Sequence, residues 1–242
     1  MLATGKDAIP LYMQIKELLI GKISRGEWLP GNVIPSEIAL SQELGVSQGT
    51  VRKAITDLVE NNVLRRKQGL GTFVSNHDND RALFHFFNIV DDDDQKVLPE
   101  SRILSCKRKQ ATRLETTKLL LDPGSEVVRI ERVRSLASVP TIFEIISLPG
   151  DRFAGLGSNR SPVLPNMLYE YYETQFGITI HSSEERLRAI SASKRDASQL
   201  GVGIDTPLLE IERVALTLDK LPVELRISRC STRQHHYHNT IF

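Results

Sequence analysis

Near the start of the chain, two short helical patterns are separated by only Gly45, Val46 and Ser47, and this spacing restricts the fold more than any other feature. Ser36 is placed to cap the first helix and Ser47 to cap the second. Each helix has one apolar face, formed by Ala39, Leu40 and Leu44 and then by Val51, Ala54, Ile55, Leu58 and Val59. Two helices joined this tightly predict a helix-turn-helix.

The flanking segments extend the pattern to a winged helix-turn-helix. Upstream, residues 10–25 carry apolar side chains at helical spacing. Downstream, residues 63–75 contain two β-type runs around a tip with Gly69 and Gly71, which predicts a hairpin. We therefore expect a winged helix-turn-helix domain over residues 8–76, a polar linker over 77–82 and a second domain over 83–242.

Basic side chains gather on the third helix and the hairpin of this domain. Residues 45–76 have a net charge of +3, from Arg52, Lys53, Arg65, Arg66 and Lys67 against Asp57 and Glu60. Such a surface can neutralise DNA phosphates. A merely solvated helix face is the alternative, but the basic hairpin beside the helix favours DNA.

The first turn of the third helix carries Gln48, Gly49 and Thr50 on its polar side. Glutamine can pair with adenine and Arg52 with guanine. Glycine in a helix costs up to about 1 kcal/mol relative to alanine, so Gly49 suggests a close approach of the backbone to the bases. Simple tolerance of glycine at a helix end stays open.

Gly69 and Gly71 do not form a nucleotide-binding loop, because the spacing of a phosphate loop is missing and no helix follows. A narrow hairpin tip that enters the minor groove explains them better.

The second domain contains an internal repeat. "IERV" occurs at residues 130–133 and again at 211–214, and each copy is followed by a turn and a Val-Pro or Leu-Pro pair. Both copies read as strand, turn, strand, so we expect related hairpins in a pseudo-symmetric antiparallel sheet. Residues 166–177 are the clearest helix here, with Leu168, Tyr171, Tyr172 and Phe176 on one side. The predicted fold class is α+β.

Composition adds a few exclusions. The hydrophobic fraction of 40% and charged fraction of 25% are ordinary for a globular protein, and the net charge is +1. Cys106 and Cys230 are far apart in sequence, which favours reduced thiols. No apolar run is long enough for a membrane span or a leader peptide, so a cytoplasmic protein without a membrane partner is expected.

Residues 10–74 resemble the DNA-binding domain of GntR-type bacterial transcriptional regulators. The shared motifs are P-L-Y-x-Q-I-K, P-S-E, L-G-V-S, T-V-R-K-A and Q-G-x-G-T-F-V. The remainder resembles, more loosely, the UTRA effector domain of the HutC-like subgroup, through "IERVR", "IFEIISLP", "PLLEIERVA" and "LPVELRIS". The resemblance implies a homodimer that binds a near-palindromic double-stranded DNA operator and responds to a small metabolite.

By this resemblance, Thr50 and Arg52 contact the operator and Gly71 lies near the wing tip. The sequence departs from the family pattern at Ile38, where members commonly have arginine, and at Gln48-Gly49, where members commonly have Arg-Thr or Arg-Met. The full set of expected DNA-binding residues is Ser36, Ser47, Gln48, Gly49, Thr50, Arg52, Lys53, Arg65, Arg66, Lys67, Gly69 and Gly71.

Arg132 and Arg134 lie two apart on a predicted strand and therefore face the same way. Paired guanidinium groups suit a carboxylate or a phosphate. Resemblance to sugar-phosphate-binding members adds Glu144 and Tyr237 to the expected effector site. The alternative is that these arginines pair with Glu131, Glu144 or Glu212 on a solvated sheet face. The second repeat has Ala215 where Arg134 would be, so the two hairpins differ chemically.

His85 completes the expected effector residues, in a segment where relatives often have a Gly/Ser-rich anion-binding loop. Here Phe84, His85, Phe86 and Phe87 are bulky. They indicate either a more apolar effector or core packing.

His236 and His238 face one side of a predicted strand, but the sequence identifies no third ligand, so no metal or cofactor is expected. The acidic run Asp91 to Asp94 reads as a solvated loop, with a cation site as the lesser alternative. No catalytic motif is present, and an enzyme is not expected. The preferred function is a metabolite-controlled transcriptional repressor; a DNA-bound scaffold and an enzyme domain with a DNA-binding head are the alternatives.

Overall fold

The computed structural model describes residues 9–75, 87–95, 98–158 and 163–239. The chain divides into two compact units, Met1–Asn76 and His77–Phe242, and each is described by itself. None of the described helices combines the length and the apolar character needed to cross a membrane.

The first unit is built on three helices, α1 (Leu11–Ser24), α2 (Glu37–Leu44) and α3 (Gln48–Glu60). Ser36 caps α2 and Ser47 caps α3, each through a hydrogen bond that its side chain accepts from a backbone N–H. Gly45 ends α2 in the left-handed conformation, with φ 64°. The helices enclose a core formed by Ile15, Leu19, Leu40, Val51, Ala54, Ile55 and Leu58.

A hairpin follows α3. Its strands β1 (Leu64–Lys67) and β2 (Gly71–Val74) pair antiparallel, and Val33 adds a single bridge to Phe73. Val63, Leu64 and Val74 are buried. The predicted winged helix-turn-helix is therefore confirmed.

The second unit contains a six-stranded antiparallel sheet in the order β4-β5-β6-β9-β8-β7. The strands are β4 (Glu100–Gln110), β5 (Glu126–Leu136), β6 (Val139–Pro149), β7 (Ser182–Ser191), β8 (Pro207–Leu216) and β9 (Pro222–Cys230). The two repeated segments form the hairpins β5–β6 and β8–β9, which meet at the centre of the sheet where β6 pairs with β9. The predicted related hairpins are thus present.

The structural repeat is longer than the sequence analysis recognised. Each hairpin is preceded by a strand and a short helix, α5 (Arg113–Leu119) or α7 (Lys194–Leu200). Each of these helices begins with a capping box, Thr112 with Glu115 and Ser193 with Asp196. Residues 111–133 align with residues 192–214 without a gap. The sheet is therefore two β-α-β-β units facing each other across β6 and β9.

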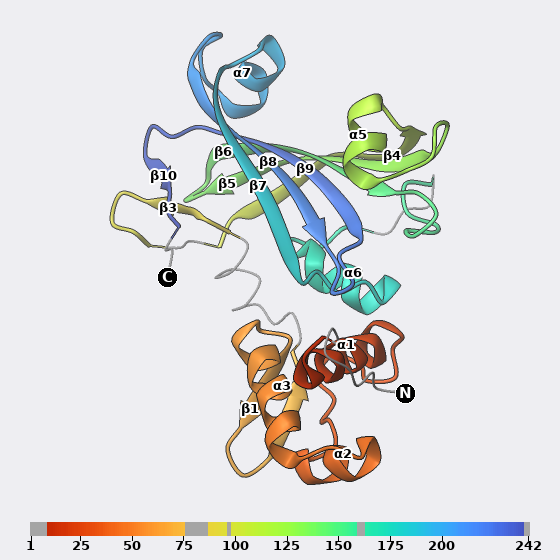
Figure 1. The fold of residues 1–242 in the computed structure, drawn as a ribbon. Coiled ribbons are helices and arrows are strands. Elements are labelled where there is room, and N and C mark those ends of the chain that lie inside the picture. The colour runs from red at the N-terminus through yellow and green to blue at the C-terminus, as the bar shows by residue number, and fades with distance from the viewer. Residues whose placement is uncertain (1–8, 76–86, 96–97, 159–162, 240–242) are drawn as a thin grey trace. The chain divides into compact units, whose positions relative to one another are not determined.

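The two faces of the sheet are covered by different helices (Figure 1). Helices α5 and α7 lie on one face, and α6 (Leu168–Phe176) lies on the other. Leu168, Tyr169 and Tyr172 are buried, and Tyr171 and Phe176 are half-buried. Tyr171 and Phe176 pack against the same core as Leu168 and Tyr172, so the four residues that were predicted to share one side of the helix all contact this core, and Tyr169 is an additional core residue.

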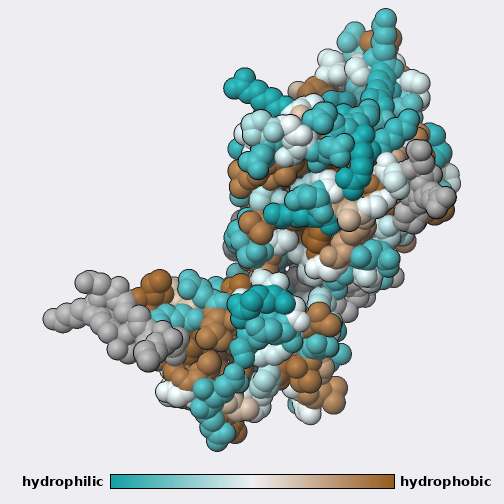
Figure 2. All heavy atoms as spheres, turned by 90° about the vertical axis from the view of Figure 1, so that its right-hand side faces the viewer, coloured by the Kyte–Doolittle hydropathy of each residue, from teal (hydrophilic) through white to brown (hydrophobic). Residues whose placement is uncertain are grey.

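A separate two-stranded sheet, β3 (Ile89–Asp91) with β10 (His235–Tyr237), lies beside one end of the large sheet (Figure 1). Phe87 and Ile89 pack there against Leu136, Ile142, Ile211 and Cys230. On the face shown in Figure 2, hydrophilic residues cover most of the second unit and hydrophobic residues form scattered patches among them.

Glu115 anchors α5 to the sheet. Its buried carboxylate accepts hydrogen bonds from Arg129 at 2.7 Å, from the Ser147 hydroxyl at 2.5 Å and from the Thr112 backbone at 2.7 Å. Burial alone would raise the pKa of Glu115, but the bonds from Arg129, Ser147 and Thr112 hold this pKa below its ordinary value.

We predict that Glu115→Gln lowers the free energy of unfolding by about 2 kcal/mol at neutral pH, because a charged acceptor of several bonds is lost. A depressed native pKa stabilises the fold above the unfolded pKa and loses this effect as pH falls through the native value. The deficit of the variant should therefore shrink below about pH 4.5. Glu126→Gln, at an exposed position on β5, is the control in urea titrations. Equal deficits at every pH would contradict the assignment.

Candidate functional sites

The polar side of α3 is the first candidate site. Gln48, Gly49, Arg52 and Lys53 are exposed, and they lie opposite the buried residues of the same helix. Ser47 ties the first turn to this face, because its Oγ accepts the Thr50 N–H and lies 2.7 Å from the Thr50 hydroxyl. The cap therefore fixes the conformation of the first turn of α3, in which Gln48 and Gly49 are exposed.

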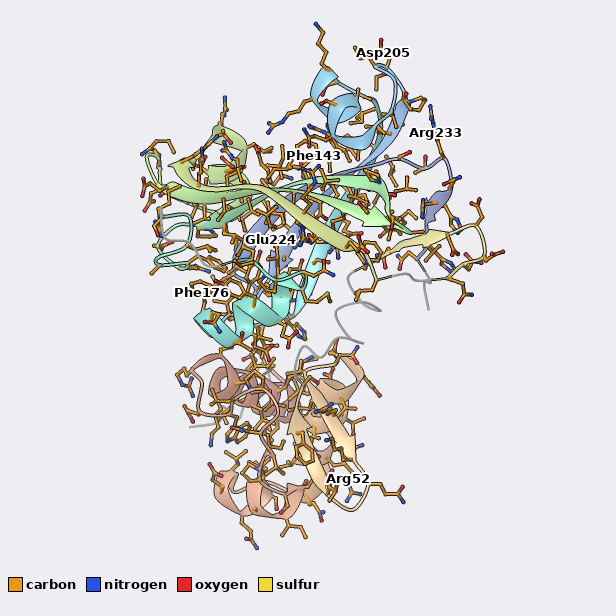
Figure 3. The ribbon with its side chains drawn as sticks, turned by 180° about the vertical axis from the view of Figure 1, so that it is seen from behind. Arg52, Phe143, Phe176, Asp205, Glu224 and Arg233 are labelled. Atoms are coloured by element: carbon orange, nitrogen blue, oxygen red, sulfur yellow. The ribbon has the colours of Figure 1, made fainter. Side chains whose placement is uncertain are left out.

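One carboxylate connects α3 to the hairpin. Glu37, in the first turn of α2, accepts hydrogen bonds from Arg52 at 2.9 Å and from Arg66 at 3.3 Å. Arg66 also donates to Thr56 at 3.0 Å. Figure 3 shows Arg52 at the surface of this unit. The shared carboxylate orients two cations from different elements on the same side.

Two lysines of the same surface lie on aromatic rings. Lys53 Nζ is 3.9 Å from the centre of the Tyr12 ring, and Lys67 Nζ is 4.9 Å from the centre of the Phe73 ring. The last predicted basic residue, Arg65, is half-buried in β1.

The glycines of this surface differ in what the fold requires of them. Gly69 and Gly71 have φ of 73° and 117°, which side chains rarely adopt, and a Cβ on Gly71 would come within 3.2 Å of Val33. A Cβ on Gly49 would meet nothing closer than the Ser47 Oγ at 3.9 Å. The fold therefore requires glycine at the wing tip but not at Gly49.

The second candidate site is a small cavity of about 30 Å³ in the second unit, between the large sheet and the β3–β10 pair. It is lined by Phe87, Asn88, Ile89, Arg134, Ile142, Glu144, Ile211, Arg213, Arg226, Ser228, Cys230 and Tyr237. This volume holds about one or two water molecules. Strands from both repeats therefore supply its polar wall, and β3 and β10 cover it.

Arg132 and Glu144 form a buried ion pair beside the cavity, with a distance of 2.5 Å from Nε to Oε2. The other carboxylate oxygen accepts the Ser228 hydroxyl at 3.1 Å and lies 3.6 Å from Arg226. Burial would raise the pKa of Glu144, but Arg132 and Arg226 lower it well below the ordinary value. The alternative was right that Arg132 pairs with Glu144, but wrong that the pair lies on a solvated sheet face, because Arg132 is only 1% exposed.

Arg226 has a carboxylate of its own on the same strand. Glu224 accepts from Arg226 Nε at 2.9 Å and Nη2 at 2.8 Å, and from the hydroxyls of Tyr169 and Tyr172. Figure 3 shows Glu224 between the sheet and α6. Through Glu224, the arginine on β9 is thus connected to the two buried tyrosines of α6.

A third network connects β8 to the covering strand β10. Arg213 donates to Glu185 at 2.6 Å, and the Tyr237 hydroxyl donates to the same carboxylate. Asn88 donates to the Tyr237 oxygen at 3.0 Å. Burial, followed by the interaction with Glu185, raises the pKa of Tyr237 to about 12. Tyr237 therefore attaches the covering strands to the wall of the cavity.

Arg134 differs from the other arginines of the cavity. It is 6% exposed, its Nε has no hydrogen-bond partner, and it forms no ion pair within the described part of the chain. Its guanidinium lies over the Phe87 ring, 4.9 Å from the centre. Burial, followed by repulsion from Arg132, lowers the pKa of Arg134 to about 9. The cavity thus contains one buried cation without a matching anion.

The structure brings together most of the effector residues that the sequence indicated. Arg134, Glu144 and Tyr237 line the cavity, and Arg132 pairs with Glu144 behind its wall. His85, with Phe84 and Phe86, lies outside the described residues, whereas Phe87 both lines the cavity and packs in the core.

Sequence reasoning missed several residues of the network, namely Asn88, Glu185, Glu224, Arg226 and Ser228. The alternation of Glu224, Arg226 and Ser228 along one strand was a usable signal, because residues two apart share a face. Glu185 and Asn88 carry no such signal, since only the sheet order brings them here.

The comparisons with known proteins agree with this architecture. Residues 11–74 match the model of the bacterial regulatory proteins of the gntR family, and residues 94–236 match the UTRA domain. The chain belongs to the GntR family. Its second unit is a UTRA domain, as the motifs indicated, and the GntR/UTRA architecture identifies a transcriptional regulator rather than an enzyme.

Two relatives and one solved structure illustrate the similarity. The HTH-type transcriptional repressor NagR of Bacillus subtilis is 30% identical over 86% of this chain and 85% of its own length. The mannosyl-D-glycerate transport/metabolism system repressor MngR of Escherichia coli is 30% identical over 83% of each chain. The ligand-binding domain of a GntR-family regulator from Bordetella bronchiseptica is 33% identical, with a TM-score of 0.57, over 64% of this chain and 96% of that one.

Arg132 and Arg134 offer a matched test of the cavity, since they lie two apart on β5. Arg132→Met should lower the free energy of unfolding by about 3 kcal/mol, because Glu144 loses its buried partner. Arg134→Met should leave stability unchanged or raise it, because it removes a buried charge that has no partner. Denaturant titrations at one protein concentration measure both. Equal destabilisation by the two variants would show that Arg134 is compensated in solution.

Proposed function

We propose that this GntR-family regulator is a repressor that binds a near-palindromic operator as a homodimer, and that an anionic metabolite in the UTRA cavity controls its affinity for DNA. The relatives NagR and MngR are named as repressors, which supports the sign of regulation. The observation that carries the effector part of the proposal is the buried Arg134, which forms no ion pair with any residue that the structure describes.

In the DNA-binding unit, Gln48 and Arg52 are assigned to base contacts at the first turns of α3, and Gly49 to close backbone approach. Ser36, Ser47 and Thr50 lie at helix N-termini, where N–H groups and hydroxyls suit phosphate oxygens. Lys53, Arg65, Arg66 and Lys67 are assigned to contacts with the phosphate backbone of the DNA. Gly69 and Gly71 are assigned to the wing tip that enters the minor groove.

The effector is assigned a carboxylate or phosphate group that pairs with Arg134. Arg132, Arg213 and Arg226 already have carboxylate partners, so an added anion would gain most at Arg134. An anion there removes the cost of an uncompensated buried charge, which amounts to about 3–5 kcal/mol for buried pairs that lose one partner. The positive charge of Arg134 and its low exposure to water therefore both favour an anionic ligand.

Effector binding requires β3 and β10 to move, because the cavity of about 30 Å³ is smaller than a metabolite. This movement would separate the Phe87 ring from Arg134 and break the hydrogen bond from Tyr237 to Glu185. Asn88, which donates to Tyr237, would move with these strands. An effector that binds one position of these strands better than the other shifts their equilibrium, and only this difference in affinity can change DNA binding.

The DNA part is tested with Gly49→Ala and Gln48→Arg. Gly49→Ala should fold at least as stably as the parent, because the Cβ has space and alanine favours a helix, yet it should bind the operator at least about 10-fold more weakly. Gln48→Arg should shift the preferred base towards guanine in a randomised-site selection. Unchanged affinity and unchanged base preference would remove both residues from the base-reading surface.

The effector part is tested by thermal unfolding of the whole protein with a panel of phosphorylated and carboxylated metabolites. A ligand of the native state raises the melting temperature by mass action, and the same compound should weaken operator binding in a gel-shift. Arg134→Met should abolish both effects, whereas Arg188→Met, an exposed arginine on β7, should retain them. Salt-sensitive DNA binding without any ligand response would instead indicate a DNA-bound scaffold.

A further inference from the structure

Three side chains with metal-binding atoms converge at the outer end of the β3–β10 sheet. They are Asp94, in the turn after β3, His236 of β10 and His238 directly after it. Asp94 Oδ1 lies 2.9 Å from His236 Nε2 and 3.0 Å from His238 Nδ1. All three donor atoms lie within 4.8 Å of one another, and all three residues are exposed. The sequence showed the two histidines, and the structure adds the third group.

Backbone pairing explains why these residues meet. His235 pairs with Asp91 and Tyr237 with Ile89, so the end of β10 lies beside the turn that follows β3. Side chains alternate along a strand, which places His236 and His238 on one side and Tyr237 on the other. The two imidazole rings are stacked, with centres 6.2 Å apart and planes at 23°.

The turn holds Asp94 in position. Asp91 Oδ1 accepts the backbone N–H groups of Asp93 and Gln95. Asp94 itself has φ 59°, a left-handed conformation that is uncommon for a residue other than glycine. The two strands and this turn therefore fix a carboxylate opposite two imidazoles from the other end of the sequence.

The electrostatic setting favours a cation. The Asp94 carboxylate lies at the end of an acidic run. Asp91, Asp92 and Asp93 precede it in the same turn. Neutral imidazole and a carboxylate are both good ligands, and a bound metal would replace the two hydrogen bonds that now join them.

We propose that Asp94, His236 and His238 form a binding site for a divalent transition-metal ion of the zinc type. Two imidazoles and one carboxylate are a donor set that zinc uses, with a further position open for water, whereas magnesium and calcium prefer oxygen ligands alone. Ligand distances of about 2.0–2.1 Å in a tetrahedral site require about 3.3 Å between donor atoms. The two distances from Asp94, 2.9 and 3.0 Å, are slightly shorter than this, and the donor atoms of His236 and His238 lie within 4.8 Å of each other, so side-chain rotation is needed to reach the tetrahedral spacing.

The proposed metal site lies on the same two strands, β3 and β10, that cover the cavity. Tyr237, between the two ligand histidines, contacts Asn88 and Glu185 on the other side of β10. A metal ion would join the turn after β3 to the end of β10, and so stabilise the pair of strands that carries Phe87, Asn88 and Tyr237. Where the proposed effector function holds, metal and effector affinities should therefore be coupled, each changing the other by the same factor.

The experiment is a titration of the untagged full-length protein with Co²⁺, followed by its visible absorption, and with Zn²⁺ as competitor. We expect one saturable ion per chain and displacement by zinc. His236→Gln and Asp94→Asn should each weaken binding by at least about 100-fold, since even groups that only orient ligands contribute 10–100-fold. His235→Gln is the matched control, because this neighbouring histidine on β10 is not part of the cluster and should leave binding unchanged.

Circular dichroism of each variant establishes that it is folded, and hydrogen exchange adds a second readout. Zinc should slow exchange of the β3 and β10 amides in the parent protein and in His235→Gln, but not in Asp94→Asn. The proposal is overturned if no one-to-one binding occurs at micromolar metal, or if His236→Gln and Asp94→Asn bind as tightly as the parent. Equal loss in His235→Gln would also overturn it, since the ion would then be held elsewhere. These outcomes do not depend on DNA or effector, so they are separable from failure of the proposed function.

Discussion

Neutralisation of buried arginines is the constraint on which the second unit depends. Arg132, Arg134, Arg213 and Arg226 lie on the face of the sheet that also packs against α6, and each has less than a tenth of its surface exposed. Burying an ion costs several kcal/mol unless a partner and hydrogen bonds compensate it. Glu144, Glu185 and Glu224 supply three partners. Strand pairing brings Glu144 to Arg132 and Glu185 to Arg213, whereas Glu224 lies two residues from Arg226 on the same strand. Arg134 forms no ion pair among the residues that the structure describes.

The repeated β-α-β-β unit shows how one site arises from two similar halves. Arg132 and Arg213 occupy equivalent positions, but Glu144 of the first copy corresponds to Arg226 of the second. The second copy therefore takes its carboxylate from β7, through Glu185. Ala215 stands at the position equivalent to Arg134, so the second copy has no counterpart of this buried cation.

The same divergence appears on the opposite face of the sheet. Glu115 of α5 binds Arg129 of the first copy, whereas Asp196 of α7 binds Arg229, which also pairs with Glu210. Each helix is thus anchored by an acidic residue in its first turn. The arginine that binds this residue lies on the first strand of the hairpin, β5, in the first copy and on the second strand, β9, in the second copy. The sequence analysis recognised the hairpins by "IERV" but not these helices, because seven residues give too short a stretch for helical periodicity to be distinctive.

The sequence by itself determined the local structure of this protein: the helix-turn-helix with its serine caps, the glycine-dependent wing tip, the repeated hairpins and the family to which the chain belongs. These features follow from residues close in sequence, where side-chain spacing and backbone preferences act directly. Tertiary structure decided which buried arginine forms no ion pair among the described residues, that Arg132 is buried rather than solvated, and that Asp94 lies beside His236 and His238. Ion pairing and ligand geometry depend on distances across the sheet, and long-range strand pairing sets those distances.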